Sequence, residues 1–168
     1  MVMKGYNDEP EATAQAVDAD GWLHTGDLAI MRPDGYFRIT GRARDMIIRG
    51  GENVYPREIE EFLYTHPAVA DEQVIGIPDE RLGEIVVAWI RLKAGATAGA
   101  TPNEEEIRAF CHARLAYFKV PEYIRFVDAY PMTLSGKVQK FKMREFEIAT
   151  RSLEAVATQS TSASGLAF

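Results

Sequence analysis

The sequence predicts an α+β fold, in which a small mixed sheet carries helices in a split βαβ pattern and a β-hairpin precedes that unit. Two patterns favour this fold. From residue 46 onward the elements follow the order strand, helix, strand, strand, helix, strand. Before them, a Pro-Asp-Gly turn at residues 33–35 separates two short apolar segments, which is typical of a hairpin. The length of 168 residues and the hydrophobic content of 46% suit one compact domain with a few additional elements.

The N-terminal part of the chain contains the hairpin and little else that is regular. Residues 1–21 are polar and are expected to be irregular or weakly helical. The two hairpin strands fall within residues 28–40, on either side of the turn. A short apolar strand at residues 46–49 then ends at Gly50 and Gly51, a pair that favours a turn.

Two helices are predicted from their first residues and from their apolar spacing. The first begins at Pro56, because a missing N–H costs nothing at the first helical position, and it places Ile59 and Leu63 on one face. The second is expected to begin with a capping box, in which Thr101 is the N-cap residue and Glu104 is the third helical residue.

The remaining elements are shorter or less regular. Strands are predicted at residues 73–77, 85–92 and 123–127, which are rich in apolar and β-branched residues. A short helix is predicted at residues 141–148. Residues 151–168 are rich in Ser, Thr and Ala, offer little to bury, and are predicted to form a disordered tail.

Composition and charge exclude several classes of function. The formal net charge of −6 and the pI of about 5.1 argue against general nucleic-acid binding. The single cysteine, Cys111, excludes an internal disulfide framework and a cysteine-rich metal site, and is interpreted as a packed core thiol. The three histidines lack the spacing of metal ligands. The sequence shows neither an apolar run of about 18 residues nor the apolar core of a signal peptide, so the expected location is the cytoplasm.

The segment between residues 119 and 144 is basic, with six basic and two acidic residues. This pattern indicates either a local anionic ligand or a solvated basic face. The segment includes a Ser-Gly-Lys sequence, but it is not a phosphate-binding P-loop. Pro131 stands where that motif requires its first Gly, and Val138 stands where it requires Ser or Thr. The sequence also lacks the Gly-x-Ser-x-Gly elbow of a serine hydrolase.

Three segments, taken in order, resemble the adenylate-forming superfamily and in particular its acyl-CoA synthetases (fatty-acyl-CoA ligases). Residues 22–27 read Trp-Leu-His-Thr-Gly-Asp. Residues 41–60 begin with Gly-Arg-Ala-Arg-Asp and continue through Gly-Gly-Glu-Asn to Glu-Ile-Glu. Residues 131–140 read Pro-Met-Thr-Leu-Ser-Gly-Lys-Val-Gln-Lys. The resemblance covers residues 1–147 and implies the fold of the small C-terminal domain of these enzymes.

The family converts a carboxylate and ATP into an acyl-adenylate and pyrophosphate, and then transfers the acyl group to CoA. The resemblance implies that residues 1–42 are the end of the large N-terminal adenylation domain and that residues 43–150 are the small mobile C-terminal domain. The phosphate loop and the acyl pocket of the family lie in the large domain, upstream of the residues present here. The expected activity is that of a long-chain fatty-acid–CoA ligase, and the chain alone is expected to be inactive.

The resemblance assigns roles to three residues on either side of the predicted domain boundary: Asp27, Arg42 and Arg44. Asp27 is expected to accept hydrogen bonds from both ribose hydroxyls of the adenylate, since a carboxylate offers two acceptor oxygens to a vicinal diol. Arg42 is expected to support the ribose or the phosphate with its planar fork of donors. Arg44 matches the hinge, where family members often carry Asp or Lys, and its alternative interpretation is a surface arginine.

The resemblance also indicates residues for the CoA step. Gly50 and Gly51 are expected to bring bare backbone against the pantetheine channel, and a simple turn is the alternative. Phe118 and Lys119 match a segment near the CoA nucleotide. Some relatives carry basic residues directly after this segment, whereas the present chain has Glu122 there.

Lys137 is the expected catalytic residue. By resemblance it reaches the substrate carboxylate and the α-phosphate during adenylation, where it stabilises charge that moves toward pyrophosphate. In an isolated Ser-Gly-Lys turn the same lysine would be an ordinary surface residue. No metal ligand is expected in this chain, and Mg²⁺ is assigned to the absent N-terminal domain.

The expected partners are a carboxylic acid, ATP/AMP, CoA and the missing N-terminal domain, with no nucleic acid and no transmembrane segment. Self-association through the exposed domain interface is a further expectation. Two alternatives stay open at this point: an adenylation domain that loads a carrier protein, and a non-catalytic binding module of the same fold.

Overall fold

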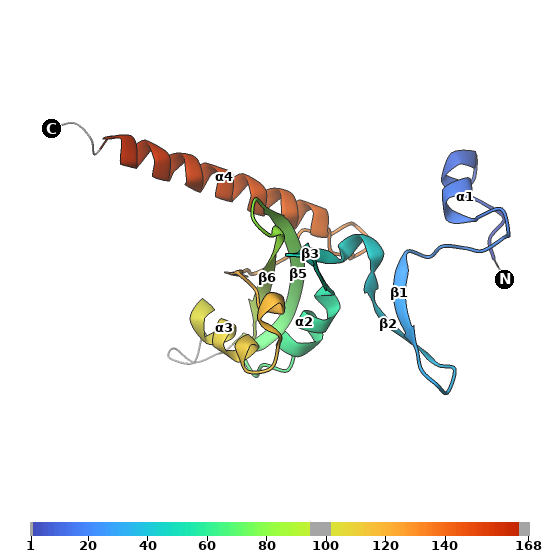
Figure 1. Cartoon of the computed structure of the whole chain (residues 1–168), viewed down its shortest axis with the longest axis horizontal. Helices are drawn as coiled ribbons and strands as arrows, with labels where there is room; N and C mark the ends of the chain where they lie inside the picture. The colour runs from blue at the N-terminus through green and yellow to red at the C-terminus, as the bar shows by residue number, and fades with distance from the viewer. Residues whose placement is uncertain (1, 95–101, 165–168) are drawn as a thin grey trace. The chain divides into compact units, whose positions relative to one another are not determined.

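The computed structural model describes residues 2–94 and 102–164, with side chains described as far as Ser152. The chain divides into two compact units, residues 1–44 and 45–168 (Figure 1). This division falls two residues after the predicted boundary, and the assignment of the first unit to a larger domain stays a prediction. No helix among the described residues combines the length and the apolar character needed to cross a membrane.

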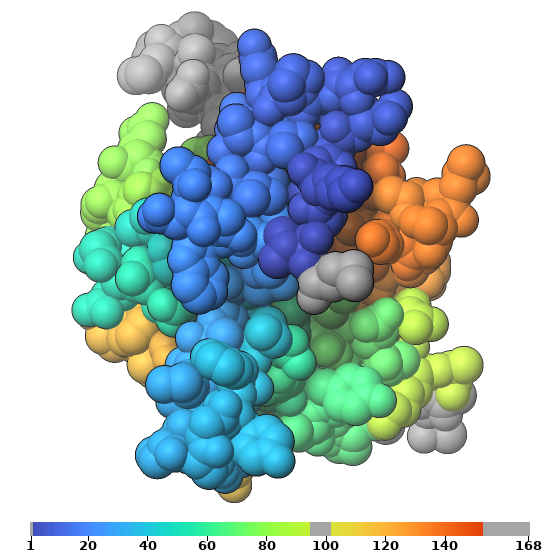
Figure 2. All heavy atoms as spheres, turned by 90° about the vertical axis from the view of Figure 1, so that its right-hand side faces the viewer, coloured from blue at the N-terminus to red at the C-terminus, as the bar shows by residue number. Residues whose placement is uncertain are grey.

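The first unit contains a short helix and the predicted hairpin. Helix α1 spans Pro10–Ala16, and the antiparallel strands β1 and β2 span Asp27–Met31 and Phe37–Arg42. The turn closes through a 2.8 Å hydrogen bond from the Arg32 N–H to the Tyr36 carbonyl. The hairpin prediction is therefore confirmed. Its large apolar side chains are exposed, and its tip is drawn in lighter blue at the bottom of Figure 2.

The second unit is built on a small mixed sheet of five strands. The strands are β3 (Ile47–Arg49), β4 (Glu52–Val54), β5 (Val69–Asp79), β6 (Gly83–Leu92) and β7 (Tyr123–Phe126). β5 and β6 pair antiparallel along their length, β7 runs parallel to β6, and β3 joins β6 through the pair Arg49↔Gly83. The predicted sheet is confirmed. β4 was not predicted, because its three residues include a single apolar side chain and give no period-2 signal.

Helices cover both faces of this sheet (Figure 1). α2 (Pro56–Leu63) and α3 (Glu104–His112) pack on one face, as the split βαβ pattern predicts, and α4 (Lys140–Ser164) packs on the other. Alternate residues of β5 and β6 point to opposite sides, so the strands supply two separate cores. The core under α2 and α3 includes Val74, Val86, Ala88 and Ile90 together with Ile59, Leu63, Ile107 and Cys111. The core under α4 includes Ile75, Ile77, Ile85, Val87 and Trp89 together with Tyr130 and Met143.

Two expectations about helix ends were wrong. The capping box of α3 is formed by Asn103 and Glu106, whose side chains each accept a hydrogen bond from the other residue's backbone N–H. Thr101, the expected N-cap, lies outside the described residues. α4 continues to Ser164, past residue 150, where a disordered tail was expected to begin. No Gly or Pro interrupts residues 140–164, so nothing in the backbone chemistry stops the helix before Gly165.

Glu72 on β5 is a buried carboxylate with an unusual protonation equilibrium. Its side chain is 8% exposed and its Oε2 has no hydrogen-bond partner in the structure. Burial, together with the nearby charges of Asp71 and Glu60, raises the pKa of Glu72 from 4.5 to about 7. The folded protein therefore holds a proton between pH 4.5 and 7 that the unfolded chain releases.

We expect Glu72→Gln to change how stability depends on pH. Because the folded pKa is the higher one, ionisation of Glu72 destabilises the wild-type fold as the pH rises from about 4.5 to 7. The shift corresponds to a relative gain for the variant on the order of 3 kcal/mol at pH 8 compared with pH 4. Urea unfolding across this range measures the free energy of unfolding of both proteins. A difference between them that stays constant with pH would contradict the raised pKa of Glu72.

Candidate functional site

The structure brings Asp27 and Arg42 together across the hairpin. They are paired residues of β1 and β2, and the Arg42 Nε lies 2.9 Å from the Asp27 Oδ1. The Thr25 hydroxyl accepts a hydrogen bond from the Asp27 N–H at 3.1 Å, which fixes the start of the strand. The carboxylate is 32% exposed, and it retains acceptor capacity beyond the arginine. The pair is therefore an anion and a cation presented side by side, as the predicted ribose and phosphate contacts require.

Arg44 lies in a single 3₁₀ turn, Ala43–Asp45, and it is exposed. It is the last residue of the first unit. Arg44 belongs to neither the core under α2 and α3 nor the core under α4, so its backbone torsions can change without disturbing these cores. Its placement is compatible with the predicted hinge.

Gly50 and Gly51 form the turn between β3 and β4. Their φ angles are +60° and +87°, in the left-handed region that glycine adopts without strain. The Gly50 N–H donates to the Leu82 carbonyl at 2.7 Å, and a Cβ at Gly51 would meet no atom within 4 Å. The turn geometry alone accounts for both glycines within this unit, and their role beside pantetheine stays a prediction.

Phe118 and Lys119 lie in a short 3₁₀ helix, η2 (Tyr117–Lys119). The Lys119 ammonium is bound by both oxygens of Glu58 on α2, at 2.7 and 2.8 Å. Glu58 lies in the first turn of α2, where an acidic residue favours the start of the helix. The structure shows that it also positions Lys119, a role that no local pattern could indicate because the two residues are 61 positions apart.

Lys137 projects from a tight loop between β7 and α4. The Thr133 hydroxyl accepts a hydrogen bond from the Lys137 N–H at 3.0 Å, and the Thr133 N–H donates to the Lys137 carbonyl at 2.8 Å. Gly136 has a φ of +79°, which the turn requires. The side chain of Lys137 is exposed, and the structure gives its Nζ no ion-pair partner among the described residues. The loop thus presents a free cation on a well-defined backbone.

The two groups of predicted residues are anchored to opposite faces of the sheet. Tyr130 and Val138, which flank the Lys137 loop, pack in the core under α4. Phe118 and Val120, which flank Lys119, pack in the core under α2 and α3. The lysine predicted for adenylation and the residues predicted to contact the CoA nucleotide are therefore carried on different sides of the same small unit.

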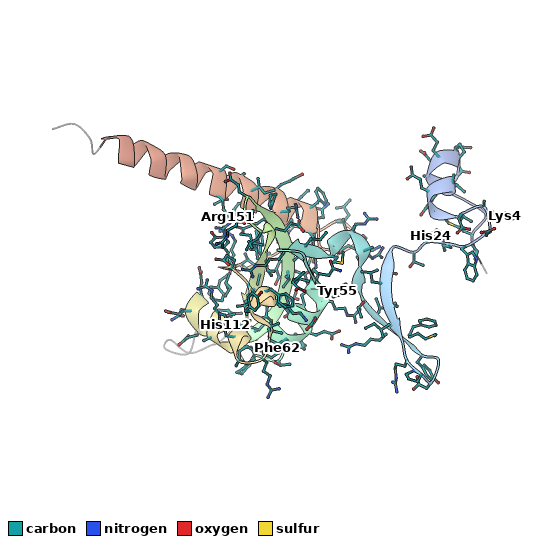
Figure 3. The ribbon with its side chains drawn as sticks, in the orientation of Figure 1. Lys4, His24, Tyr55, Phe62, His112 and Arg151 are labelled. Carbon is teal, nitrogen blue, oxygen red and sulfur yellow. The ribbon has the colours of Figure 1, made fainter. Side chains whose placement is uncertain are left out.

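Other candidate nucleophiles and metal ligands do not form a site. Cys111 is fully buried on α3, and burial raises the pKa of its thiol to about 11, so the interpretation as a packed core thiol is confirmed. His112 ends α3 and is exposed, as Figure 3 also shows. Within residues 2–94 and 102–152, no group of three or more His, Cys, Asp or Glu side chains could hold a metal ion.

Comparisons with known proteins show what the chain is similar to. Residues 58–137 match the family model described as the AMP-binding enzyme C-terminal domain. A Bacillus subtilis protein named as a proposed acyl-CoA synthetase, YngI, is 58% identical over 144 residues, which cover 86% of this chain and 26% of that protein. The human mitochondrial medium-chain acyl-CoA ligase ACSF2 is 54% identical over 144 residues, which cover 23% of its length. The chain thus spans about a quarter of the length of these relatives.

Solved structures of adenylate-forming enzymes are also similar to this chain. ATP-bound MatB from Rhodopseudomonas palustris is similar with a TM-score of 0.77 and 40% identity, over 86% of this chain and 28% of that one. The amide bond synthetase McbA from Marinactinospora thermotolerans is similar with a TM-score of 0.78 and 39% identity, over 87% and 29% of the two chains. The chain therefore carries, over residues 58–137, the AMP-binding enzyme C-terminal domain, and it is similar in sequence to acyl-CoA synthetases and ligases and in structure to adenylate-forming enzymes.

Proposed function

We propose that this chain acts as the C-terminal part of an ATP-dependent acyl-CoA ligase. In the first half-reaction a carboxylate oxygen of the acid attacks the α-phosphorus of ATP, and pyrophosphate leaves. In the second, the CoA thiolate attacks the acyl carbon, and AMP leaves. The observation that carries the proposal is the identity of 54–58% over 144 residues with proteins named as acyl-CoA synthetase or ligase.

The arrangement of the second unit supports a reaction in two poses. The Lys137 loop is anchored to the core under α4, and the Lys119 segment to the core under α2 and α3. One orientation of a rigid unit presents only one of these faces to a single reaction centre. A pivot at Arg44, the last residue of the first unit, would let the same centre receive each face in turn.

Each predicted residue has a task in this scheme. In the adenylation pose, Lys137 stabilises the negative charge that develops on the α-phosphate and on pyrophosphate. Asp27 and Arg42 hold the ribose and phosphate of the adenylate. In the thioester pose, Lys119 and Phe118 contact the CoA nucleotide. ATP binding by this family brings Mg²⁺ with it, and we assign its ligands, as before, to a large N-terminal domain.

The acyl substrate and the acceptor are the least constrained parts of the proposal. The mammalian relatives are named for medium-chain acids, so the expectation of a long-chain acid has no support beyond the resemblance. A superfamily member of similar structure is named an amide bond synthetase, so the fold by itself does not select CoA as acceptor. We propose CoA because the acyl-CoA ligases are more similar in sequence. A cytoplasmic location remains part of this proposal, and cell fractionation tests it.

We expect Arg44→Pro to impair the thioester step more than adenylation. Proline fixes φ and removes one N–H, so the backbone at the proposed pivot loses freedom. With the enzyme in the adenylation pose at rest, thioester formation should fall roughly 10- to 100-fold. Single-turnover assays of each half-reaction measure the split, and Arg44→Lys, which keeps the backbone free, is the control. An unchanged thioester rate in the proline variant would remove Arg44 as the pivot.

The proposed function is tested by ATP–pyrophosphate exchange with a panel of medium-chain, long-chain and aromatic acids. The 168-residue chain should give no acid-dependent exchange, because it supplies only one wall of the site and a lysine exposed to water is screened. The chain joined behind a large adenylation domain in one polypeptide should give exchange and, with CoA, a thioester.

Three outcomes would redirect the assignment. Acid-dependent exchange by the chain alone, above a Lys137→Ala control, would show that it is a complete enzyme. Acyl transfer to a carrier-protein thiol in place of CoA would favour the carrier-loading alternative. An absence of exchange with every acid in the joined polypeptide would favour a non-catalytic module.

A further inference from the structure

Arg49 makes an unusual set of contacts for the last residue of a three-residue strand. Its side chain is 13% exposed. One of its terminal nitrogens, Nη1, donates to the carbonyl oxygens of Phe118 at 3.1 Å and Val120 at 3.0 Å. The other, Nη2, lies 2.8 Å from a carboxylate oxygen of Glu122. One guanidinium thus binds three acceptors on a segment that lies 69 to 73 positions later in the chain.

These acceptors surround a predicted CoA contact. The two carbonyls belong to the residues on either side of Lys119, so they set the orientation of its backbone. Arg49 itself is directly followed by Gly50 and Gly51. The guanidinium therefore ties the glycine turn and the η2 segment into one body.

We propose that Arg49 is a positioning residue for the CoA half-reaction, which holds Phe118 and Lys119 in register with the Gly50–Gly51 turn. The inference rests on the proposed function and adds a residue to which no role was assigned above. Arg49 acts through these residues and need not touch CoA itself.

The chemistry of the contacts explains why an arginine is needed. A guanidinium carries five donors in a rigid plane, so it can serve two backbone carbonyls and a carboxylate together, whereas a lysine ammonium is a compact point charge. The carboxylate of Glu122 compensates the largely buried charge of Arg49. Glu122 stands where some relatives carry a basic residue, so its charge here serves the positioning of η2.

The first part of the test is hydrogen exchange on the 168-residue chain without any substrate. The backbone N–H groups of Lys119 and Val120 donate within η2, to the carbonyls of Ala116 and Tyr117. We expect Arg49→Met to speed exchange at these two amides about tenfold or more, since two carbonyl contacts that hold the turn are lost. Arg91→Met is the matched control, because Arg91 is 45% exposed and its ion pair with Asp71 is 3.4 Å long.

The second part measures the two half-reactions of the chain joined behind its large domain. We expect Arg49→Met to raise the KM for CoA about tenfold and to leave ATP–pyrophosphate exchange unchanged. Arg49→Lys should recover part of the CoA affinity, because it restores the charge opposite Glu122 but not the fork. Arg91→Met should behave as the unsubstituted enzyme in both assays.

The outcomes separate this inference from the proposed function. Equal losses in adenylation and thioester formation would make Arg49 a general stabiliser of the fold and overturn the positioning role. Unchanged exchange at Lys119 and Val120, or an unchanged KM for CoA, would overturn it as well. An unsubstituted enzyme that forms acyl-adenylate but no CoA thioester would instead count against the proposed function.

Discussion

Lys137→Ala should lower the rate of acyl-adenylate formation about 100- to 1,000-fold when the chain is assayed joined behind a large adenylation domain, as proposed above. Under the proposed function, the cation acts on charge that develops on the α-phosphate and the leaving pyrophosphate, and this charge belongs to the first half-reaction only. Thioester formation from acyl-adenylate supplied in the assay should therefore keep its rate. Pyrophosphate release and thioester formation, followed separately in single turnovers, give the two rates.

The structure of the Lys137 loop does not depend on the Lys137 side chain, so the substitution tests the charge alone. Its backbone is held by Thr133 and Gly136, so removal of the exposed Lys137 side chain leaves the hydrogen bonds of the turn in place. Lys142→Ala is the matched control, since Lys142 is an exposed lysine in the first turns of the helix that follows. A similar loss in both half-reactions, or in the control, would argue against the specific role of Lys137.

Glu147→Ala should destabilise the second unit by about 3–5 kcal/mol, the usual cost of removing one partner from a buried ionic group. Glu147 on α4 is fully buried, and its carboxylate accepts a hydrogen bond from the Trp89 indole at 2.7 Å. Arg125 and Arg151 both pair with the same carboxylate. Arg151 lies on the side of α4 that faces the strands (Figure 3), 3.3 Å from the centre of the Tyr123 ring. Without Glu147, both guanidinium groups lose the carboxylate that they share, and the indole N–H loses its acceptor.

The measurement is urea unfolding of the chain, with the exposed Glu145 changed to Ala as the control on the same helix. Glu147→Gln should fall between the wild type and Glu147→Ala, because the amide still accepts from Trp89 but cannot balance the arginines. Burial by itself raises the pKa of Glu147, yet hydrogen bonds from Arg125 and Trp89 outweigh it and bring the pKa below its usual value. The contribution of Glu147 is therefore present above pH 4.5 and is lost as the pH falls further, opposite in sign to that of Glu72. A loss below about 1 kcal/mol for Glu147→Ala would show that the network contributes little.

Local sequence patterns were sufficient for most of the second unit. Pro56 begins α2, and the apolar spacing of Ile59 and Leu63 selects the buried face of that helix. The Val- and Ile-rich runs give β5 and β6, although both strands extend beyond the predicted bounds because antiparallel pairing continues through polar residues such as Glu72 and Glu84. Such pairing depends on the partner strand, which no single segment contains.

The same distinction applies to the candidate site. The motifs named Asp27, Arg42, Arg44, Lys119 and Lys137 as a set, because residue type and order along the chain carry a family resemblance. They could not indicate what holds each one. Glu58, the partner of Lys119, lies 61 positions away along the chain, and Trp89, one partner of the Glu147 carboxylate, lies 58 positions away. Contacts between residues so far apart in the sequence form only when the sheet closes.

The sequence by itself therefore determined the class of fold, the hairpin, the helix that begins at Pro56 and the identity of the candidate residues, since turn chemistry, apolar period and motif order are local properties of the chain. The tertiary structure decided the rest. It placed the Lys137 loop and the Lys119 segment on opposite faces of one sheet, and it closed the contacts of Arg49 with η2. These contacts form between side chains on different strands and helices. Because the two residues of each contact are far apart in the sequence, neither segment alone shows a pattern that predicts it.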